Sequence, residues 1–132
     1  LGRKLLLRVK DIMRTDTEIP RVATNTSVIE GLMEMTSKGL GMTAIADDDN
    51  RLQGIFTDGD LRRRLDAGID LHTSTMEQVM TRQCKTTNPE MLAAEAVHLL
   101  EQHNISSLVV VDDAGMLVGA LNVHDLFRAG VM

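Results

Sequence analysis

Two stretches of the sequence combine side chains that could either start a helix or hold a ligand. In GIFTDGDLRR (54–63), Thr57 and Asp60 stand three residues apart, where an apolar run ends and arginines begin. A threonine followed at the third helical position by an acid is typical of a helix N-cap. The same place can bind a phosphorylated sugar, because the first turn of a helix offers unpaired N–H groups to an anion. GALNVHDLFR (119–128) nearly repeats the pattern, so both interpretations are open at two places in the chain.

The composition limits what kind of protein this is. At 132 residues, the chain suits one compact domain or two small ones that share a core. It is 43% hydrophobic, with nine Met, two Phe and no Trp or Tyr, so we expect an aliphatic core in which Met is filler rather than ligand. The net charge of −5 and the scarcity of aromatic rings argue against binding nucleic acid, whose affinity depends on neutralised phosphates.

The sequence predicts a cytoplasmic protein that does not span a membrane. Nothing in it approaches the roughly 18 consecutive apolar residues that a membrane span requires. The single Cys84 can form no internal disulfide and no secretory leader is present, which favours a reducing compartment. The chain begins with LGRKLLLR, and we expect these residues, 1–8, to be a linker from a longer protein.

The chain contains an internal repeat. Residues 30–63 align without gaps with residues 95–128, at an offset of 65, and eight of the 34 positions are identical. Further upstream, VKDIMRT (9–15) pairs with MEQVMTR (76–82) at an offset of 67. We therefore expect two copies of one structural unit.

Each copy, residues 9–70 and 76–132, is predicted to run strand, helix, strand, strand, helix. Ser27 begins an S-x-x-E cap in the first copy, and Asn88 is predicted to cap the corresponding helix of the second, with a proline at its first helical position. Short apolar runs joined by DDDN and by DDAG predict a hairpin in each copy. A unit of this size would expose one face of its sheet. We therefore expect an α+β fold in which the two copies pack sheet to sheet about a pseudo-twofold axis.

These motifs, in this order, resemble a family. An opening D-I-M or Q-V-M, a capped helix, a strand ending in V-V-D-D, and then G-h-h-T-x-x-D-h (h apolar) resemble a CBS domain. Two in tandem resemble the CBS pair, or Bateman module, over nearly the whole chain. The wording of LGRKLLLRVKDIM, GMTAIADDDNRLQGIFTDGDLRR and HDLFRAGVM is also similar to the C-terminal portion of D-arabinose 5-phosphate isomerases.

The resemblance implies a place in sugar metabolism for the parent protein. D-arabinose 5-phosphate isomerases interconvert ribulose 5-phosphate and arabinose 5-phosphate on the way to Kdo, the acidic sugar of lipopolysaccharide. By the same resemblance, the isomerase chemistry would reside in an N-terminal sugar-isomerase domain to which residues 1–8 lead. We expect no catalysis by this chain itself.

The CBS family binds adenosyl and related nucleotides in clefts between its two units, which gives the polar motifs a role by resemblance. Carried over by position, the resemblance implies a first cleft formed by Thr57, Asp60, Thr81, Lys85, Thr86, Ile105 and Ser106, and a second formed by Thr15, Leu40, Asn122 and Asp125. A carboxylate would repel a phosphate, so Asp60 is expected to accept hydrogen bonds from the ribose 2′ and 3′ hydroxyls. Thr57 and the first N–H groups of the helix suit phosphate or ribose oxygens. Asn122 departs from the family's threonine, which puts the second cleft in doubt.

The remaining titratable residues predict neither a metal site nor a catalytic centre. The four histidines lack the spacing of metal ligands, and Cys84 has no C-x-x-C partner. No nucleophile with a base and an orienting group can be assembled from the sequence.

Two functions are open. In the first, the chain is a regulatory sensor of AMP, ATP or CMP-Kdo that reports to the isomerase domain. CMP-Kdo carries a phosphate and a carboxylate, which Arg62, Arg82 and Lys85 could meet. In the second, the chain is a structural module that binds no ligand and only forms a homodimer of CBS pairs.

Overall fold

The computed structural model describes residues 6–132, which form two compact units. One unit contains residues 6–16 together with Lys85–Met132, and the other contains Thr17–Cys84. Each unit has its own three-stranded sheet, and the order of its strands is β1-β2-β3 in one and β4-β5-β6 in the other. The predicted α+β class and the order strand, helix, strand, strand, helix are confirmed. Residues 1–5 of the expected linker lie outside the described residues.

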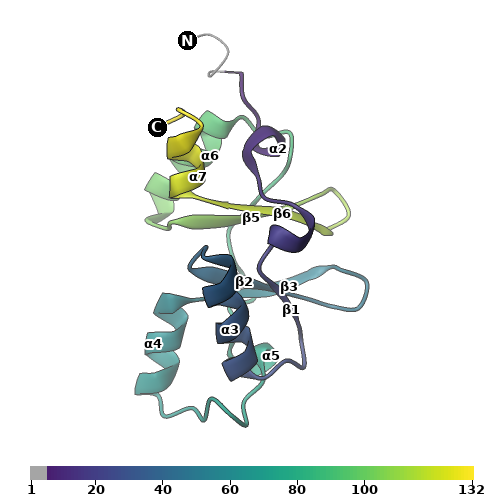
Figure 1. Cartoon of the computed structure of the whole chain (residues 1–132), viewed down its shortest axis with the longest axis vertical. Coiled ribbons are helices and arrows are strands. Elements are labelled where there is room, and N and C mark those ends of the chain that lie inside the picture. Colours follow the sequence, from purple (N-terminus) through teal and green to yellow (C-terminus); the bar gives the residue numbers. More distant parts are fainter. Residues whose placement is uncertain (1–5) are drawn as a thin grey trace. The chain divides into compact units, whose positions relative to one another are not determined.

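The unit Thr17–Cys84 packs its helices against the sheet β1-β2-β3 (Figure 1). Its elements are β1 (Arg21–Ala23), α3 (Val28–Lys38), β2 (Met42–Ala46), β3 (Leu52–Thr57), α4 (Asp58–Asp66) and α5 (Met76–Val79), and a 3-10 turn, η1 (Asp16–Glu18), precedes them. Strand β1 is parallel to β2, and β3 returns antiparallel to β2. The buried core comprises Val28, Ile45, Phe56, Met76, Val79 and Met80. It is mostly aliphatic, with one aromatic ring.

The other unit repeats this arrangement. Its elements are α2 (Val9–Ile12), β4 (Thr86–Thr87), α6 (Ala93–His103), β5 (Ser107–Val111), β6 (Leu117–Asn122) and α7 (Val123–Arg128). Strand β4 is parallel to β5, and β6 is antiparallel to β5. The core is entirely aliphatic and comprises Val9, Ala93, Ala96, Leu100, Leu108, Val110, Leu121 and Leu126.

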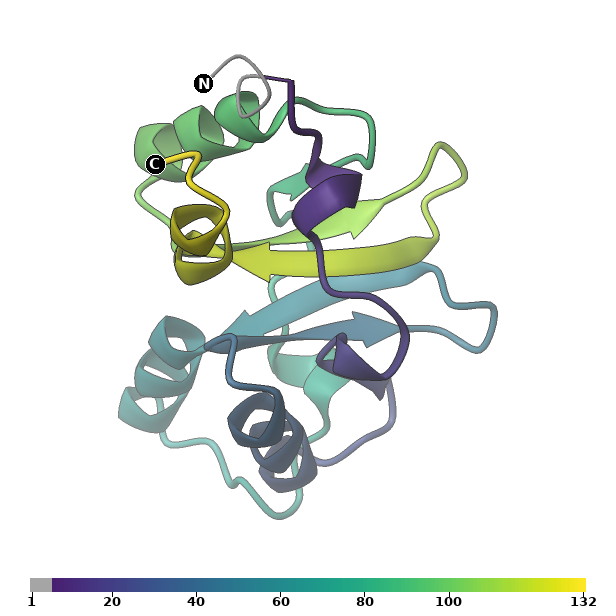
Figure 2. The ribbon, with the colours of Figure 1, turned by 45° about the horizontal axis from the view of Figure 1, so that its top comes forward.

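The two repeats exchange their opening helices. Figure 2 shows α2, in purple, beside the green and yellow elements that come about a hundred residues later in the chain. The Val9 amide donates to the Met91 carbonyl at 2.8 Å, and the Ala93 amide donates to the Leu7 carbonyl at 2.8 Å. In the other unit, the amide of Met76 at the start of α5 donates to the Thr26 carbonyl at 2.7 Å. The compact units therefore contain segments from both sequence repeats.

The start of α6 differs from the prediction. Its N-cap is Leu92, which makes no side-chain cap, and the helix begins at Ala93. Asn88 instead closes a separate turn, because its side-chain oxygen accepts from the Glu90 amide at 3.0 Å and its carbonyl accepts from the Met91 amide at 3.2 Å. The prediction that Asn88 caps this helix is wrong. Its counterpart is correct, since Ser27 caps α3 by accepting from the Glu30 amide at 3.2 Å.

A glycine in each returning strand allows another segment to approach closely. A Cβ on Gly54 would lie 2.6 Å from the Thr81 carbonyl oxygen, and one on Gly119 would lie 3.1 Å from the Arg14 carbonyl oxygen. Thr81 exchanges two backbone hydrogen bonds with Ile55, of 3.0 and 2.8 Å, and Arg14 does the same with Ala120, at 2.8 and 3.2 Å. The absence of a Cβ at each glycine therefore allows Thr81 or Arg14 to lie against the strand that precedes the last helix of the repeat.

We expect Gly54→Ala to destabilise the protein by about 1–3 kcal/mol, the usual cost of overpacking a well-filled site. The atom that its Cβ would meet is a backbone oxygen, which cannot swing away. Gly59→Ala is the matched control, because its nearest neighbour is the Arg63 guanidinium at 3.4 Å. Urea unfolding of both variants measures the difference, and equal losses would contradict the close-approach argument.

A second prediction concerns acid stability. Glu34 accepts hydrogen bonds from Lys38 Nζ at 2.7 Å and from the Arg21 amide at 3.0 Å. Burial raises the pKa of Glu34, but these hydrogen bonds and the two positive charges outweigh it, so the pKa lies below its ordinary value. A carboxyl whose pKa is lowered by folding contributes stability at neutral pH, and that contribution is lost as the pH falls through the folded-state pKa.

Glu34→Gln should therefore lower the free energy of unfolding at pH 7. Its difference from the wild type should shrink as the pH falls from the ordinary pKa range of a glutamate to below it, because the lowered pKa means that the wild-type carboxyl takes up its proton only there. Denaturant unfolding across this range measures the difference. A constant difference at every pH would show that the carboxylate charge contributes nothing.

Candidate functional site

Thr57 and Asp60 form a reciprocal capping box at the start of α4. The Asp60 amide donates to Thr57 Oγ1 at 3.1 Å, and the Thr57 amide donates to Asp60 Oδ2 at 3.0 Å. The helix begins at Asp58, directly after β3, so the end of the strand positions both side chains. The predicted role of Thr57 as a helix N-cap is confirmed.

The same carboxylate has two further partners. Asp60 Oδ1 accepts from Arg63 Nη2 at 2.5 Å and from Thr81 Oγ1 at 3.2 Å. Asp60 is only 7% exposed, whereas the side chain of Arg63 is 71% exposed. A carboxylate offers about four acceptor positions, and these described partners occupy three of them. Asp60 is therefore a buried acid with one acceptor position open and one cationic partner at the surface.

Asn122 and Asp125 form the corresponding capping box at the start of α7. The Asp125 amide donates to Asn122 Oδ1 at 3.0 Å, and the Asn122 amide donates to Asp125 Oδ2 at 3.1 Å. Arg128 Nη2 donates to Asp125 Oδ1 at 2.6 Å, as Arg63 does to Asp60. Asp125 is 8% exposed. Up to this point the two sites have equivalent contacts.

Arg14 makes the second site different. Its Nε donates to Asp125 Oδ2 at 3.2 Å and its Nη2 donates to Asp125 Oδ1 at 3.1 Å. This two-bond pairing of a guanidinium with a carboxylate is among the strongest side-chain pairings in proteins. With Asn122 and Arg128, it fills all four acceptor positions of Asp125.

The sequence carried a signal for this difference. Arg14 and Thr81 occupy the same position of the aligned segments VKDIMRT and MEQVMTR, and each makes the backbone bridge described above. The second cleft was predicted to contain Thr15, the next residue, which is exposed. Arg63 and Arg128 were identical in the repeat alignment but were not assigned to the sites. The alignment of the two repeats pairs Arg14 with Thr81 and Arg63 with Arg128, and it therefore identifies these partners where residue type alone does not.

The other predicted site residues make no recorded side-chain hydrogen bond to these two carboxylates, although the Ser106 carbonyl accepts from the Val123 amide at 2.9 Å at the start of α7. In the unit that contains α6, Lys85 is exposed, Thr86 begins β4, and Ile105 and Ser106 precede β5. In the unit Thr17–Cys84, Leu40 is buried after the end of α3. The recorded side-chain hydrogen bonds join Thr57, Asp60 and Thr81 in one unit and Asn122 and Asp125 in the other.

The arginine run after Asp60 does not act as one group. Arg62 is exposed, Arg63 pairs with Asp60, and Arg64 Nε donates to the Val79 carbonyl at 3.3 Å. Arg82 lies 3.9 Å from the Glu77 carboxylate at the surface. Arg62 and Arg82 are therefore two exposed cations of this unit that an added anion could pair with.

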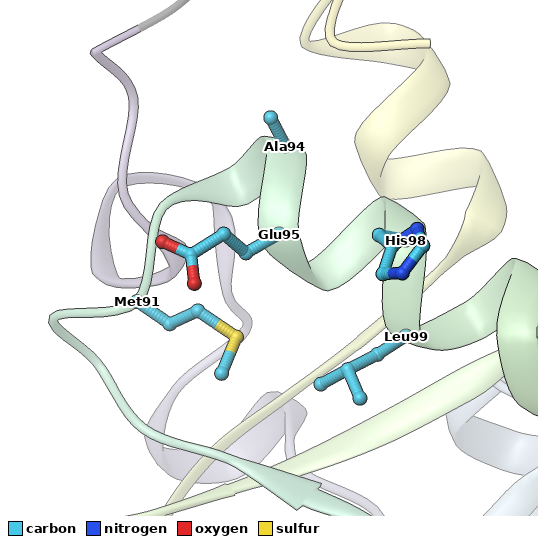
Figure 3. A pocket seen from close by; sticks show the side chains of 5 residues that line it. All are labelled: Met91, Ala94, Glu95, His98 and Leu99. Atoms are coloured by element: carbon cyan, nitrogen blue, oxygen red, sulfur yellow. The ribbon is translucent and has the colours of Figure 1, made fainter.

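A pocket lies along α6 and the turn before it. Figure 3 shows its lining, which consists of Met91, Ala94, Glu95, His98 and Leu99. Three of these side chains are apolar, and its one acid is not matched by a lysine or arginine in the lining. The pocket therefore lacks the charge needed to bind a phosphate.

Metal ligands, membrane-spanning helices and reactive thiols are other features that could indicate a function. Within residues 6–132, no three His, Cys, Asp or Glu side chains come together in a way that could hold a metal ion. None of the helices described in this range is long and apolar enough to cross a bilayer. Burial raises the pKa of the Cys84 thiol, which disfavours the reactive thiolate.

Comparisons with known proteins place this geometry in a family. The CBS domain family matches residues 9–67 and 76–131. Arabinose 5-phosphate isomerase KdsD of Pseudomonas aeruginosa is 56% identical over the whole chain, which covers 40% of that protein. This chain thus spans less than half the length of its curated relative.

Solved structures with the same fold are also similar. The CBS domain pair of protein MJ0100, in complex with 5′-methylthioadenosine and S-adenosyl-L-methionine, is 26% identical with a TM-score of 0.81, and the match covers 93% of this chain and 94% of that one. CBSX2 in complex with AMP has a TM-score of 0.81 at 24% identity, over 95% and 96% of the two chains, which indicates a shared fold. The chain therefore belongs to the CBS domain family and contains two copies of that domain.

Proposed function

We propose that this chain is the regulatory, non-catalytic part of a cytoplasmic D-arabinose 5-phosphate isomerase and binds a nucleotide or nucleotide sugar beside Asp60. The high identity to KdsD along the whole chain supports this parent protein. Since the chain covers 40% of that relative, the remaining length has room for an attached sugar-isomerase domain. Binding would be reported to that domain as feedback.

The observation that carries the proposal is the incomplete set of partners around the Asp60 carboxylate. A buried acid with an open acceptor position suits a neutral hydroxyl donor, such as those of a ribose. If Arg63 turns into solvent, a second position opens, and two adjacent hydroxyls can then bind the carboxylate. The first turn of α4 lies beside it, where N–H groups favour a phosphate.

The ligand class follows from this pairing of a diol acceptor with an anion site. AMP, ATP and CMP-Kdo all carry a ribose and at least one phosphate. CMP-Kdo adds a carboxylate, for which Arg62 and Arg82 are exposed candidates in the same unit. The similar CBS pair in complex with 5′-methylthioadenosine and S-adenosyl-L-methionine, which both carry a ribose diol, supports this class of ligand. Contributions from Lys85, Thr86, Ile105 and Ser106 stay predictions.

A second candidate function is a dimerisation module without a ligand. It is favoured by large apolar side chains at the surface, with Met33 and Phe127 each 67% exposed and Leu65 48% exposed. A second copy of the chain could cover such residues in a homodimer of CBS pairs. The two functions are compatible, so the test must separate ligand binding from assembly.

We expect at least one of AMP, ATP, CMP and CMP-Kdo to bind in calorimetric titrations and to raise the melting temperature. At 100 times the dissociation constant, binding adds about 2.7 kcal/mol of stability. Asp60→Asn should abolish this increase, because the amide is uncharged and offers fewer acceptor positions. Asp66→Asn is the control, since Asp66 is exposed at the far end of the same helix.

Sedimentation of the same variants measures assembly. Loss of the ligand effect in Asp60→Asn with an unchanged dimer supports sensing. Silence from all four compounds with the wild-type chain would reject sensing and leave dimerisation as the function.

A further inference from the structure

We infer that Arg14 closes the second repeat's site, so that each chain binds one nucleotide rather than two. The inference rests on the proposed nucleotide binding at Asp60 and concerns which residue decides where binding occurs. Position 14 of one repeat and position 81 of the other are equivalent, and each is held beside the carboxylate of its own unit. The side chain at this position is a selector: threonine leaves the carboxylate available, and arginine occupies it.

The two carboxylates differ in the number of acceptor positions that the protein leaves open. Asp60 accepts one hydrogen bond from a backbone amide, one from a neutral hydroxyl and one from a guanidinium. Asp125 accepts one from a backbone amide and three from two guanidinium groups. A ribose diol can use the open position on Asp60, whereas on Asp125 it must first displace a cation.

Displacing a cation costs more at Asp125 than at Asp60, because Arg14 is less exposed than Arg63 or Arg128. Arg63 and Arg128 reach back from exposed positions on their helices, with side chains 71% and 66% exposed, so either can turn into water. The side chain of Arg14 is only 23% exposed, and its backbone is fixed by the bridge to Ala120. Moving it off Asp125 would leave a partly buried guanidinium without its carboxylate. Removing one partner of such an ion pair is costly, and a neutral hydroxyl cannot replace the lost charge.

Thr81 contacts Asp60 differently from the way in which Arg14 contacts Asp125. Its hydroxyl donates a single hydrogen bond of 3.2 Å, and its side chain is too short to cover both oxygens of Asp60. A hydroxyl can also accept a hydrogen bond, so Thr81 can join a ligand network rather than exclude one. A single side-chain difference at equivalent positions therefore accounts for an open and a closed site.

The test is a set of calorimetric titrations with AMP, ATP, CMP and CMP-Kdo that measures the number of molecules of each compound bound per chain. The wild type should bind one equivalent. Thr81→Arg should reduce this binding at least tenfold, because it installs at Asp60 the pairing seen at Asp125. Gln83→Arg is the matched control, since it adds the same charge at an exposed residue two positions away and should keep one equivalent.

A gain of binding provides the reverse test. In a chain that carries Asp60→Asn, the further change Arg14→Thr should restore binding of one equivalent, and adding Asp125→Asn should remove it again. 2′-Deoxy-AMP should bind this opened site more weakly than AMP if the carboxylate accepts the ribose hydroxyls. Circular dichroism melts establish that each variant is folded, and Arg14→Gln serves as a second opening variant if Arg14→Thr does not fold.

The outcomes separate the two proposals. Two equivalents in the wild type, or binding to Asp60→Asn that disappears on adding Asp125→Asn, would overturn the closure by Arg14 while leaving nucleotide binding intact. Failure of both folded opening variants to bind would overturn the closure as well. Binding by the opened variants but not by the wild type would support the closure and reject the assignment of the ligand to Asp60. No binding by any variant would reject both.

Discussion

The carboxylate at the third position of each repeat's last helix is the group on which the other contacts depend. Asp60 and Asp125 are 7% and 8% exposed, so their oxygens need hydrogen-bond partners from the protein or from a ligand. Capping the helix uses one acceptor position of each acid. The remaining positions face the residue at position 81 or 14. The helix cap therefore leaves acceptor positions on each carboxylate for other partners, and a capping role does not by itself exclude a ligand.

The glycines of the returning strands determine which residue the carboxylate meets. At Gly54 and Gly119 the absence of a Cβ allows a second segment to lie against the strand, and the backbone bridges then fix Thr81 and Arg14. Both units have such a close approach, since a Cβ would lie 2.6 Å from the Thr81 carbonyl at Gly54 and 3.1 Å from the Arg14 carbonyl at Gly119. A similar backbone arrangement therefore presents Thr81 to one carboxylate and Arg14 to the other. The backbone bridge and the helix cap do not involve the side chain at position 14 or 81. Arginine and threonine can therefore occupy this position in the same backbone arrangement.

Local interactions explain which parts of this structure could be predicted from the sequence. The caps at Ser27 and Thr57 and the hairpins follow from residues close in sequence, and the α+β repeats follow from the apolar pattern. The prediction that Asn88 caps α6 is wrong because its side-chain oxygen accepts from the Glu90 amide within a separate turn. The exchange of opening helices and the pairing of Arg14 with Asp125 join residues about 50 to 110 positions apart, which no local pattern reports. Only the alignment of the two repeats could have indicated the pairing of Arg14 with Asp125, because it places Arg14 opposite Thr81.

The two arrangements also differ in what stabilises their units. Around Asp125 the protein itself supplies every partner, so the start of α7 depends on no small molecule. Around Asp60 the set is incomplete, and a ligand that completes it stabilises only the folded state of that unit. A ligand sensor needs a site with unfilled hydrogen-bond positions. A site whose positions the protein already fills gains little binding free energy from a ligand. Under the proposed function, Asp60 is therefore the acid suited to bind a ligand, whereas Asp125 already accepts four hydrogen bonds from the protein.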